Sequence, residues 1–471
     1  MSGVSAALAR HVVYPLHERA LKRPTFDYLN ELERSQWLSR EAIEHLQLDK
    51  LQRFLRTALD HCSWHAQRLR ACGLADILER GRLTLDDLQR LPTMTKQDAR
   101  ENGAAMCWSN VAGGSFPYNT GGSSGAPLIF RFGRLRQASD AAGRIRARRW
   151  WGVDVGDHEI YLWGAPSKPT GTDRIKSLRD RLLNQLVLNA FDMSPKNMDA
   201  YIVAIRAYRP HCVYGYASSV ALLAAHARER GASLQSPGLR VVCTTGEPLY
   251  PHQRALIAEV FKAPVANEFG SRDMGFTAHE TPANEMLLMS ESIILEVLDN
   301  DGNPAAPGEL GEAVMTGLCS EAQPFIRYRT GDMVRLGREP PSCGRGLHRI
   351  TEIAGRTTDF VVRSDGSIMH ALAVIYVVRA IEGVAEFKLI QHTPSEVEVQ
   401  CVPDARWSQA SEAAIVDGLQ KRLGESCRVT IRLVAGIARE ASGKYRYVVS
   451  HVPLPSGLDV AQHHVGSGEL Q

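Results

Sequence analysis

The sequence predicts an α/β protein with a large N-terminal domain, whose first part is helical, and a smaller α+β C-terminal domain. Three observations support this fold class. Residues 1–102 carry apolar positions at helical spacing, residues 116–336 alternate short apolar runs with helical stretches, and a different mixture of strand and helix patterns follows position 355. A chain of 471 residues is long enough to form two or more domains.

The helical N-terminal region is clearest at residues 48–74, where leucines and other apolar residues recur at helical spacing without strand alternation. The α/β region contains short apolar runs that we expect to form strands: IYLWGA, HCVYGY, LRVVCTTGE, PVANEFG, IILEVLD and ELGEAVMTG. Several of them end in small or polar residues. Because ligands in open α/β sheets bind at the carboxyl ends of strands, we expect these residues to converge on a site.

The C-terminal region combines strand patterns, such as EVEVQCV at 396–402, with a helix at 413–423. We expect it to form a separate domain. Residues 453–471 are rich in Gly, Ser and Pro and predict a poorly ordered tail. His463 and His464 in that tail could bind a metal, although a mobile segment is the favoured interpretation.

Composition limits the function classes. A formal net charge of +3 is small for this length and argues against a nucleic-acid-binding surface. Nine scattered cysteines without a CxxC pair indicate reduced thiols, and no export signal or long apolar segment is apparent, so we expect a cytoplasmic protein without a membrane span. Seven arginines between positions 131 and 149 could contact nucleic acid or coenzyme A phosphates, but a solvated helix face is favoured.

A phosphate-binding loop is predicted at YNTGGSSGAPLIF, residues 118–130. Its glycines let backbone N–H groups approach an anion, and Thr120, Ser123 and Ser124 add hydroxyl donors beside Gly125. The loop departs from the GxxxxGK[ST] pattern because Ala126 to Leu128 stand where that motif has its lysine and hydroxyl. Taken alone, such a cluster is more often a solvated turn.

The loop opens an ordered series of motifs: TTGEPLY at 244–250, NEFGSRDMG at 267–275, IRYRTGD at 326–332, GRTTD at 355–359 and ASGKYR at 441–446. As a set this series resembles the adenylate-forming enzymes, specifically the phenylacetate-CoA ligase branch and its relatives in polysaccharide biosynthesis clusters. The resemblance covers nearly the whole chain. It implies an α/β nucleotide- and acyl-binding core at 103–356 and a mobile C-terminal domain at 357–452.

The resemblance also implies a two-step reaction. A carboxylate attacks the α-phosphate of ATP, giving an acyl-adenylate and pyrophosphate, and a nucleophile, most often the thiol of coenzyme A, then takes the acyl group. By position in the motifs, the nucleotide would be bound by Thr120, Ser123, Ser124, Gly125, Gly246, Glu247, Pro248, Asn267, Glu268, Phe269, Gly270, Asp332 and Arg356. Within this set, Asp332 would accept hydrogen bonds from the ribose hydroxyls.

Three further roles follow from the resemblance. Lys444 would be the catalytic residue, bridging the substrate carboxylate and the α-phosphate as negative charge accumulates. Asp273 stands where the family usually has a glutamate for Mg²⁺, and a shorter carboxylate can still hold a hard cation that ATP brings. Thr358 occupies the hinge position, which is commonly an aspartate.

The acyl pocket is expected to involve Trp163, Gly164, Tyr214, Gly215, Tyr216 and Ala217, which suit a flat or modest apolar acid. The two tyrosines could equally be core residues. Some relatives carry a structural zinc, but here Thr281, Leu287 and Pro341 occupy three ligand positions and only Cys343 remains. We therefore expect no zinc unless His279 and His348 substitute.

These observations predict an ATP- and Mg²⁺-dependent ligase that joins a small carboxylic acid, aromatic or apolar, to coenzyme A. The motifs describe adenylation only, so an amine or a carrier protein could instead receive the acyl group. A nucleotide-binding pseudoenzyme or scaffold is the alternative of another class, made conceivable by Asp273, Thr358 and the missing zinc ligands, while Lys444 and Asp332 argue against it.

Overall fold

The computed structural model describes residues 5–119, 128–164, 178–190, 192–299, 301–356, 360–365, 368–438 and 446–452. Short helices dominate the first hundred positions: α1 Ala6–Leu8, η1 Ala9–Val13, α2 Tyr14–Ala20, α3 Thr25–Ser35, α4 Arg40–His61, α5 Ser63–Ala71, α6 Leu74–Glu79, η2 Asp86–Arg90 and α7 Lys96–Glu101. The long helix α4 begins where the Ser39 hydroxyl accepts from the Ala42 N–H. Leu51, Leu55 and Leu69 form an apolar core shared by α4 and α5.

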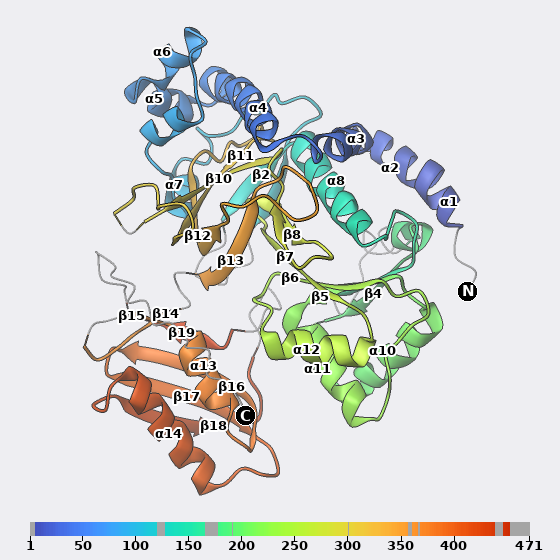
Figure 1. Ribbon diagram of the computed structural model, residues 1–471, viewed down its shortest axis with the longest axis vertical. Helices are drawn as coiled ribbons and strands as arrows, with labels where there is room; N and C mark the ends of the chain where they lie inside the picture. Colours follow the sequence, from blue (N-terminus) through green and yellow to red (C-terminus); the bar gives the residue numbers. More distant parts are fainter. Residues whose placement is uncertain are drawn as a thin grey trace.

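An eleven-stranded sheet forms the centre of the large domain (Figure 1). Its strand order is β10-β11-β12-β13-β9-β8-β7-β6-β5-β3-β4. The strands are β3 Glu159–Trp163, β4 Gln185–Asn189, β5 Cys212–Tyr216, β6 Val241–Thr245, β7 Val265–Ser271, β8 Gly275–Glu280, β9 Met286–Leu288, β10 Ile293–Leu298, β11 Leu310–Gly317, β12 Tyr328–Leu336 and β13 Arg349–Arg356. The neighbouring strands β4, β3, β5, β6 and β7 pair in parallel, and antiparallel pairing begins between β7 and β8.

Helices cover both faces of the parallel half. Helices α10 Pro195–Tyr208, α11 Ala217–Glu229 and α12 Pro251–Phe261 lie on one face, and α8 Arg134–Trp150 lies on the opposite side (Figure 1). Every residue of β5 and β6 is buried, as expected for parallel strands between two helical layers. A hairpin of β1 Phe116–Asn119 and β2 Ile129–Phe132 precedes α8. The predicted phosphate loop, residues 120–127, lies outside the described residues.

The C-terminal region has its own sheet and core, separate in Figure 1 from the eleven-stranded sheet. Its strands are β14 Phe360–Val362, β15 Ile368–His370, β16 Val384–Thr393, β17 Glu396–Pro403, β18 Arg428–Leu433 and β19 Val448–Ser450, with helices α13 Leu372–Arg379 and α14 Gln409–Leu423. The four-stranded sheet has the order β18-β17-β16-β19. The α/β architecture with a small α+β C-terminal part agrees with the fold class predicted from the sequence.

Helix α8 corrects one expectation. The arginine-rich segment was expected to present a solvated face, but Arg136, Arg146 and Arg148 are only 3%, 0% and 4% exposed. Ala142 and Gly143 bring the helix close to the sheet, where a Cβ on Gly143 would lie 2.9 Å from the Phe276 ring. Arg136 pairs with Asp140 on the same helix, whereas Arg146 and Arg148 are compensated by Glu291 and Glu159 on other segments, which sequence periodicity does not reveal.

No helix among the described residues combines the length and the apolar character needed to cross a membrane.

Candidate active site

The carboxyl ends of β5, β6 and β7 meet around Glu268. The Tyr214 hydroxyl donates to Glu268 Oε1 at 2.7 Å, and the Thr245 hydroxyl donates to the same oxygen at 3.1 Å. Glu268 is 6% exposed. Burial, followed by the negative charge of Glu268, raises the pKa of Tyr214, so its hydroxyl remains a donor at neutral pH. The parallel register thus brings three polar side chains from different strands to one edge of the sheet.

The predicted adenine-binding turn follows β6. Gly246 has φ +76°, a left-handed conformation that favours glycine. Glu247 Oε2 accepts from the Ser218 N–H in the first turn of α11 at 2.9 Å, so the negative carboxylate lies at the positive end of that helix. Pro248 follows in the same loop. The described geometry fixes this turn firmly beside the edge of the sheet.

Strand β7 carries the next predicted nucleotide residues. The Asn267 N–H donates to Glu280 Oε2 at 2.6 Å, while Asn267 Oδ1 is buried without a hydrogen-bond partner in the described part of the chain. A ligand N–H or O–H group would satisfy that acceptor. Phe269 packs against the core of the antiparallel half. A Cβ on Gly270 would lie 2.3 Å from the Gly275 carbonyl oxygen, so this position requires glycine.

Asp273 lies in the turn between β7 and β8. Its Oδ2 accepts from the Tyr328 hydroxyl at 2.8 Å, and its backbone carbonyl accepts from Arg136 Nη1 at 3.2 Å. These contacts fix the Asp273 carboxylate at the edge of the site, and carboxylate oxygens are the ligands that a hard cation such as Mg²⁺ prefers. Among the described residues, no three His, Cys, Asp or Glu side chains are grouped as a metal site.

Asp332 and Arg356 are opposite one another in the β12–β13 pair. Asp332 is 8% exposed, and its N–H donates to the Thr330 hydroxyl at 3.1 Å. The remaining predicted residues, Thr120, Ser123, Ser124, Gly125, Thr358 and Lys444, lie outside the described residues. Their roles therefore stay predictions.

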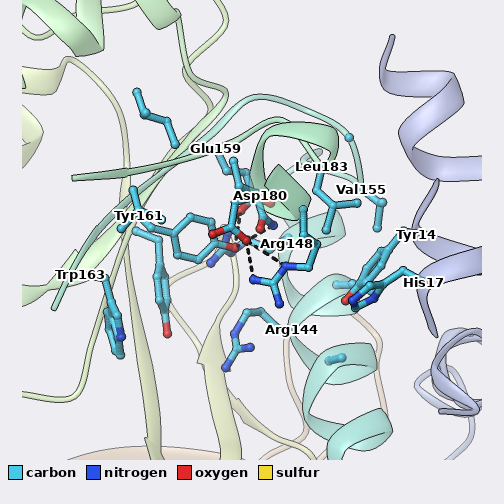
Figure 2. Close-up of a pocket in the computed structure, with 18 of the residues that line it drawn as sticks. Tyr14, His17, Arg144, Arg148, Val155, Glu159, Tyr161, Trp163, Asp180 and Leu183 are labelled. Carbon is cyan, nitrogen blue, oxygen red and sulfur yellow. Dashed lines mark hydrogen bonds and ion pairs between the residues drawn. The ribbon is translucent and has the colours of Figure 1, made fainter. Parts of the chain in front are cut away.

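A cavity of about 830 Å³ opens on the α8 side of the parallel strands. Figure 2 shows Tyr161 and Trp163 of β3 on one side, Tyr14 and His17 of α2 on the other, and arginines of α8 between them. Trp163, Gly164 and Tyr214, three of the residues expected in the acyl pocket, line this cavity.

The other three expected pocket residues pack elsewhere. A Cβ on Gly215 would lie 2.7 Å from the Leu162 carbonyl oxygen, because β3 and β5 are in close contact there. Tyr216 is 3% exposed and stacks on Trp163 with ring centroids 4.3 Å apart, and Ala217 is fully buried at the start of α11. Tyr216 thus supports the lining residue Trp163, and the described lining includes none of the three.

The two histidines considered for zinc have other contacts. His279 Nδ1 pairs with the Glu280 carbonyl oxygen at 2.8 Å, whereas His348 Nδ1 pairs with the Ser290 hydroxyl at 3.0 Å. Burial and the nearby Arg40 lower the pKa of His348 to about 3, so this imidazole is neutral at physiological pH. The absence of zinc remains a prediction.

Comparisons with known proteins point to the same family that the sequence motifs suggest. Residues 361–451 match the CapK C-terminal domain family. The chain is 22% identical to protein CapK of Staphylococcus aureus over 79% of this chain and 82% of that protein. It is 25% identical to phenylacetate-coenzyme A ligase of Thermus thermophilus over 69% of this chain and 73% of the ligase.

The crystal structure of a 2-hydroxyisobutyryl-CoA ligase in the postadenylation state has the same fold, with a TM-score of 0.69 and 23% identity over 89% of this chain and 91% of that one. The sequence relatives, the C-terminal domain match and the shared fold together support the phenylacetate-CoA ligase-like, adenylate-forming branch. The resemblance read from the ordered motifs is thereby confirmed.

Sequence reasoning missed much of the cavity wall. Tyr14 and His17 come from α2, Val155 from the loop after α8, and Arg144 and Arg148 from α8 itself. The sequence gives little indication that these residues share a cavity, because they are far apart along the chain and belong to no motif. The density of arginines in α8 was the one available clue, and it was attributed to solvent exposure.

Glu321 gives a prediction for pH dependence. Burial raises the pKa of this carboxyl group to about 7 from its usual 4.5, and no hydrogen bond or ion pair to it is found in the described part of the chain. The folded state therefore keeps a proton that the unfolded chain loses, and stability falls as pH rises from about 4.5 to about 7. We expect Glu321→Gln to raise the thermal unfolding midpoint at pH 8 and to change it little at pH 4.5.

The matched control is Glu309→Gln, because Glu309 is exposed. It should have the same midpoint as the wild type at both pH values. An equal change for Glu321→Gln at pH 4.5 and pH 8 would show that the carboxyl group is not desolvated as described.

Proposed function

We propose that this chain activates a carboxylic acid with ATP, forming an acyl-adenylate and pyrophosphate, and transfers the acyl group to the thiol of coenzyme A. One observation carries the proposal: Tyr214 lines the cavity on the α8 side and also donates to Glu268 at the carboxyl end of β7. An acid in the cavity would thus lie next to the strand ends where the nucleotide motifs converge.

The chain's own residues would divide the work. The backbone of Gly246 to Pro248 and the unsatisfied Asn267 Oδ1 would contact the base, and Asp332 would accept from the ribose hydroxyls. Asp273 would hold Mg²⁺, which neutralises phosphate charge when bound. The phosphate loop at 120–127 and Lys444 would stabilise the charge that develops during attack on the α-phosphate.

The cavity supports an acid with an aromatic or apolar body. Tyr161, Trp163 and Tyr214 present aromatic surface, and the rings of Trp163 and Tyr214 are stacked with centroids 5.6 Å apart. Such a wall would hold the acyl part rigidly while its carboxylate reaches the nucleotide.

The test is pyrophosphate release from ATP and Mg²⁺ across a panel of aromatic and aliphatic carboxylic acids, with and without coenzyme A. Acid-dependent release that coenzyme A accelerates is the expected result. Acid-dependent release that coenzyme A does not affect would point to an amine or a carrier protein as acceptor. ATP binding without pyrophosphate release with any acid would contradict the proposal and favour a pseudoenzyme.

A further inference from the structure

The arginines of α8 that contact the core have carboxylate partners within hydrogen-bond distance. Arg146 Nη1 is 2.5 Å from Glu291 Oε1, and Arg149 Nε is 2.9 Å from Asp154 Oδ1. Arg136 pairs with Asp140 at 3.1 Å, and Arg148 pairs with Glu159. Such pairing is what a low-dielectric environment demands of a guanidinium that cannot lose its proton.

Arg144 on the same helix differs. Among the described residues, its closest carboxylate oxygen is Glu268 Oε2, 3.9 Å from Nε, which is too far for a hydrogen bond. Arg144 Nε and Glu268 Oε2 are both buried atoms without a hydrogen-bond partner in the described part of the chain. The other Glu268 oxygen is already occupied by Tyr214 and Thr245.

The Arg144 side chain is 37% exposed and lines the cavity. Its guanidinium lies over the Tyr214 and Phe276 rings, 5.9 Å and 5.5 Å from their centroids. In Figure 2 no dashed line joins Arg144 to the other residues drawn, whereas Arg148 is linked to the carboxylate of Glu159. Aromatic faces orient the group but leave its in-plane N–H donors available.

The charge of the wall favours an anion. Five arginines and four carboxylates line the cavity within the described residues: Arg23, Arg144, Arg148, Arg179 and Arg181 against Glu18, Asp154, Glu159 and Asp180. Three of these arginines pair with lining carboxylates, Arg23 with Glu18, Arg148 with Glu159 and Arg179 with Asp180. The fourth carboxylate, Asp154, is held by Arg10 and Arg149, which lie outside the lining.

We propose that Arg144 binds a second anionic group on the acyl part of the substrate, so that the preferred acid carries a carboxylate besides the one that is activated. The inference rests on the proposed function and narrows its substrate class. A planar guanidinium matches a carboxylate through paired N–H donors, and this match is strong where water is excluded. An apolar acid would leave the Arg144 donors desolvated and unpaired, which disfavours its binding.

The experiment compares size-matched acids that differ in one group: hexanedioate with hexanoate, and terephthalate with 4-methylbenzoate. Acid-dependent pyrophosphate release is measured for the wild type, Arg144→Met and Arg144→Lys. We expect the wild type to prefer the diacid of at least one pair. Arg144→Met should lower kcat/KM for that diacid about 100-fold while changing the monoacid about threefold or less, and Arg144→Lys should retain part of the preference.

Arg335→Met is the matched control, because the Arg335 side chain is also 37% exposed, is paired with Glu352 at 3.1 Å, and neither residue lines the cavity. It should leave the ratio of diacid to monoacid unchanged. ATP binding by each variant, followed by thermal shift, reports whether the fold is intact.

The outcomes separate the two proposals. Acid-dependent release with no preference for either diacid, or a preference that Arg144→Met does not alter, overturns the inference and leaves the proposed function standing. An equal loss for monoacids and diacids in Arg144→Met also overturns it, because Arg144 would then act on a group that all the acids share. No release with any acid contradicts the proposed function itself, and the inference fails with it.

Discussion

Replacement of Glu291 by alanine is expected to lower the free energy of unfolding by about 3–5 kcal/mol, because it leaves the buried Arg146 without its counter-charge. Both side chains are fully buried, and Arg146 Nη1 is 2.5 Å from Glu291 Oε1. The Ser35 hydroxyl donates to the same carboxylate oxygen at 2.8 Å, so the pair joins α3, α8 and the segment before β10. The shift is measured as the change in chemical denaturation midpoint of the large domain.

Two comparisons make this result specific to the buried charge. The exposed pair of Arg228 and Glu259, on α11 and α12 of the large domain, should contribute about 0–1 kcal/mol, so Glu259→Ala serves as the surface control. The double variant Arg146→Met with Glu291→Leu should recover much of the loss, since two apolar residues leave no unpaired charge. A Glu291→Ala midpoint equal to that of Glu259→Ala would contradict the described burial.

Replacement of Lys444 by alanine is expected to reduce acid-dependent pyrophosphate release by about 10²–10³-fold, the typical loss when one donor to a developing negative charge is removed. The expectation rests on the position of Lys444 in ASGKYR, because the residue lies outside the described part of the structure. Thioester formation from supplied acyl-adenylate should be unaffected, because the attack on the α-phosphate, which needs this positive charge, is already complete. Single-turnover assays of the two half-reactions measure the difference.

Lys421→Ala is the control for Lys444→Ala, because Lys421 is a solvent-exposed lysine in the same C-terminal region. It should leave both half-reactions unchanged. Equal losses in the two half-reactions for Lys444→Ala would indicate damage to the fold or a different role for this lysine.

The sequence predicted the fold class because its signals are local. Continuous apolar runs such as VVCTT in β6 predict strands buried on both faces, and the strand and helix patterns after position 355 predict a second core. The motifs also predicted which strand ends carry polar residues, and Tyr214, Thr245 and Glu268 do meet at one edge. A local sequence pattern is sufficient to predict a site where strand pairing alone determines which residues lie close together.

The environment of α8 could not be predicted in the same way. The burial of Arg146 and Arg148 depends on Glu291 and Glu159, which lie on separate segments of the chain. Helical periodicity describes which residues share a face, but it does not show that another element carries a carboxylate opposite that face. The same limit applies to the cavity wall, where Tyr14 and Arg144 come together only through tertiary packing.

The most direct test of adenylation follows an oxygen atom. The purified chain is incubated with ATP, Mg²⁺, coenzyme A and an accepted acid labelled with ¹⁸O in its carboxylate, and the AMP formed is analysed by mass spectrometry. Attack of the carboxylate on the α-phosphate predicts AMP that carries one ¹⁸O atom, together with an acyl-CoA product. Unlabelled AMP, or label in inorganic phosphate with ADP as the nucleotide product, would contradict an acyl-adenylate mechanism.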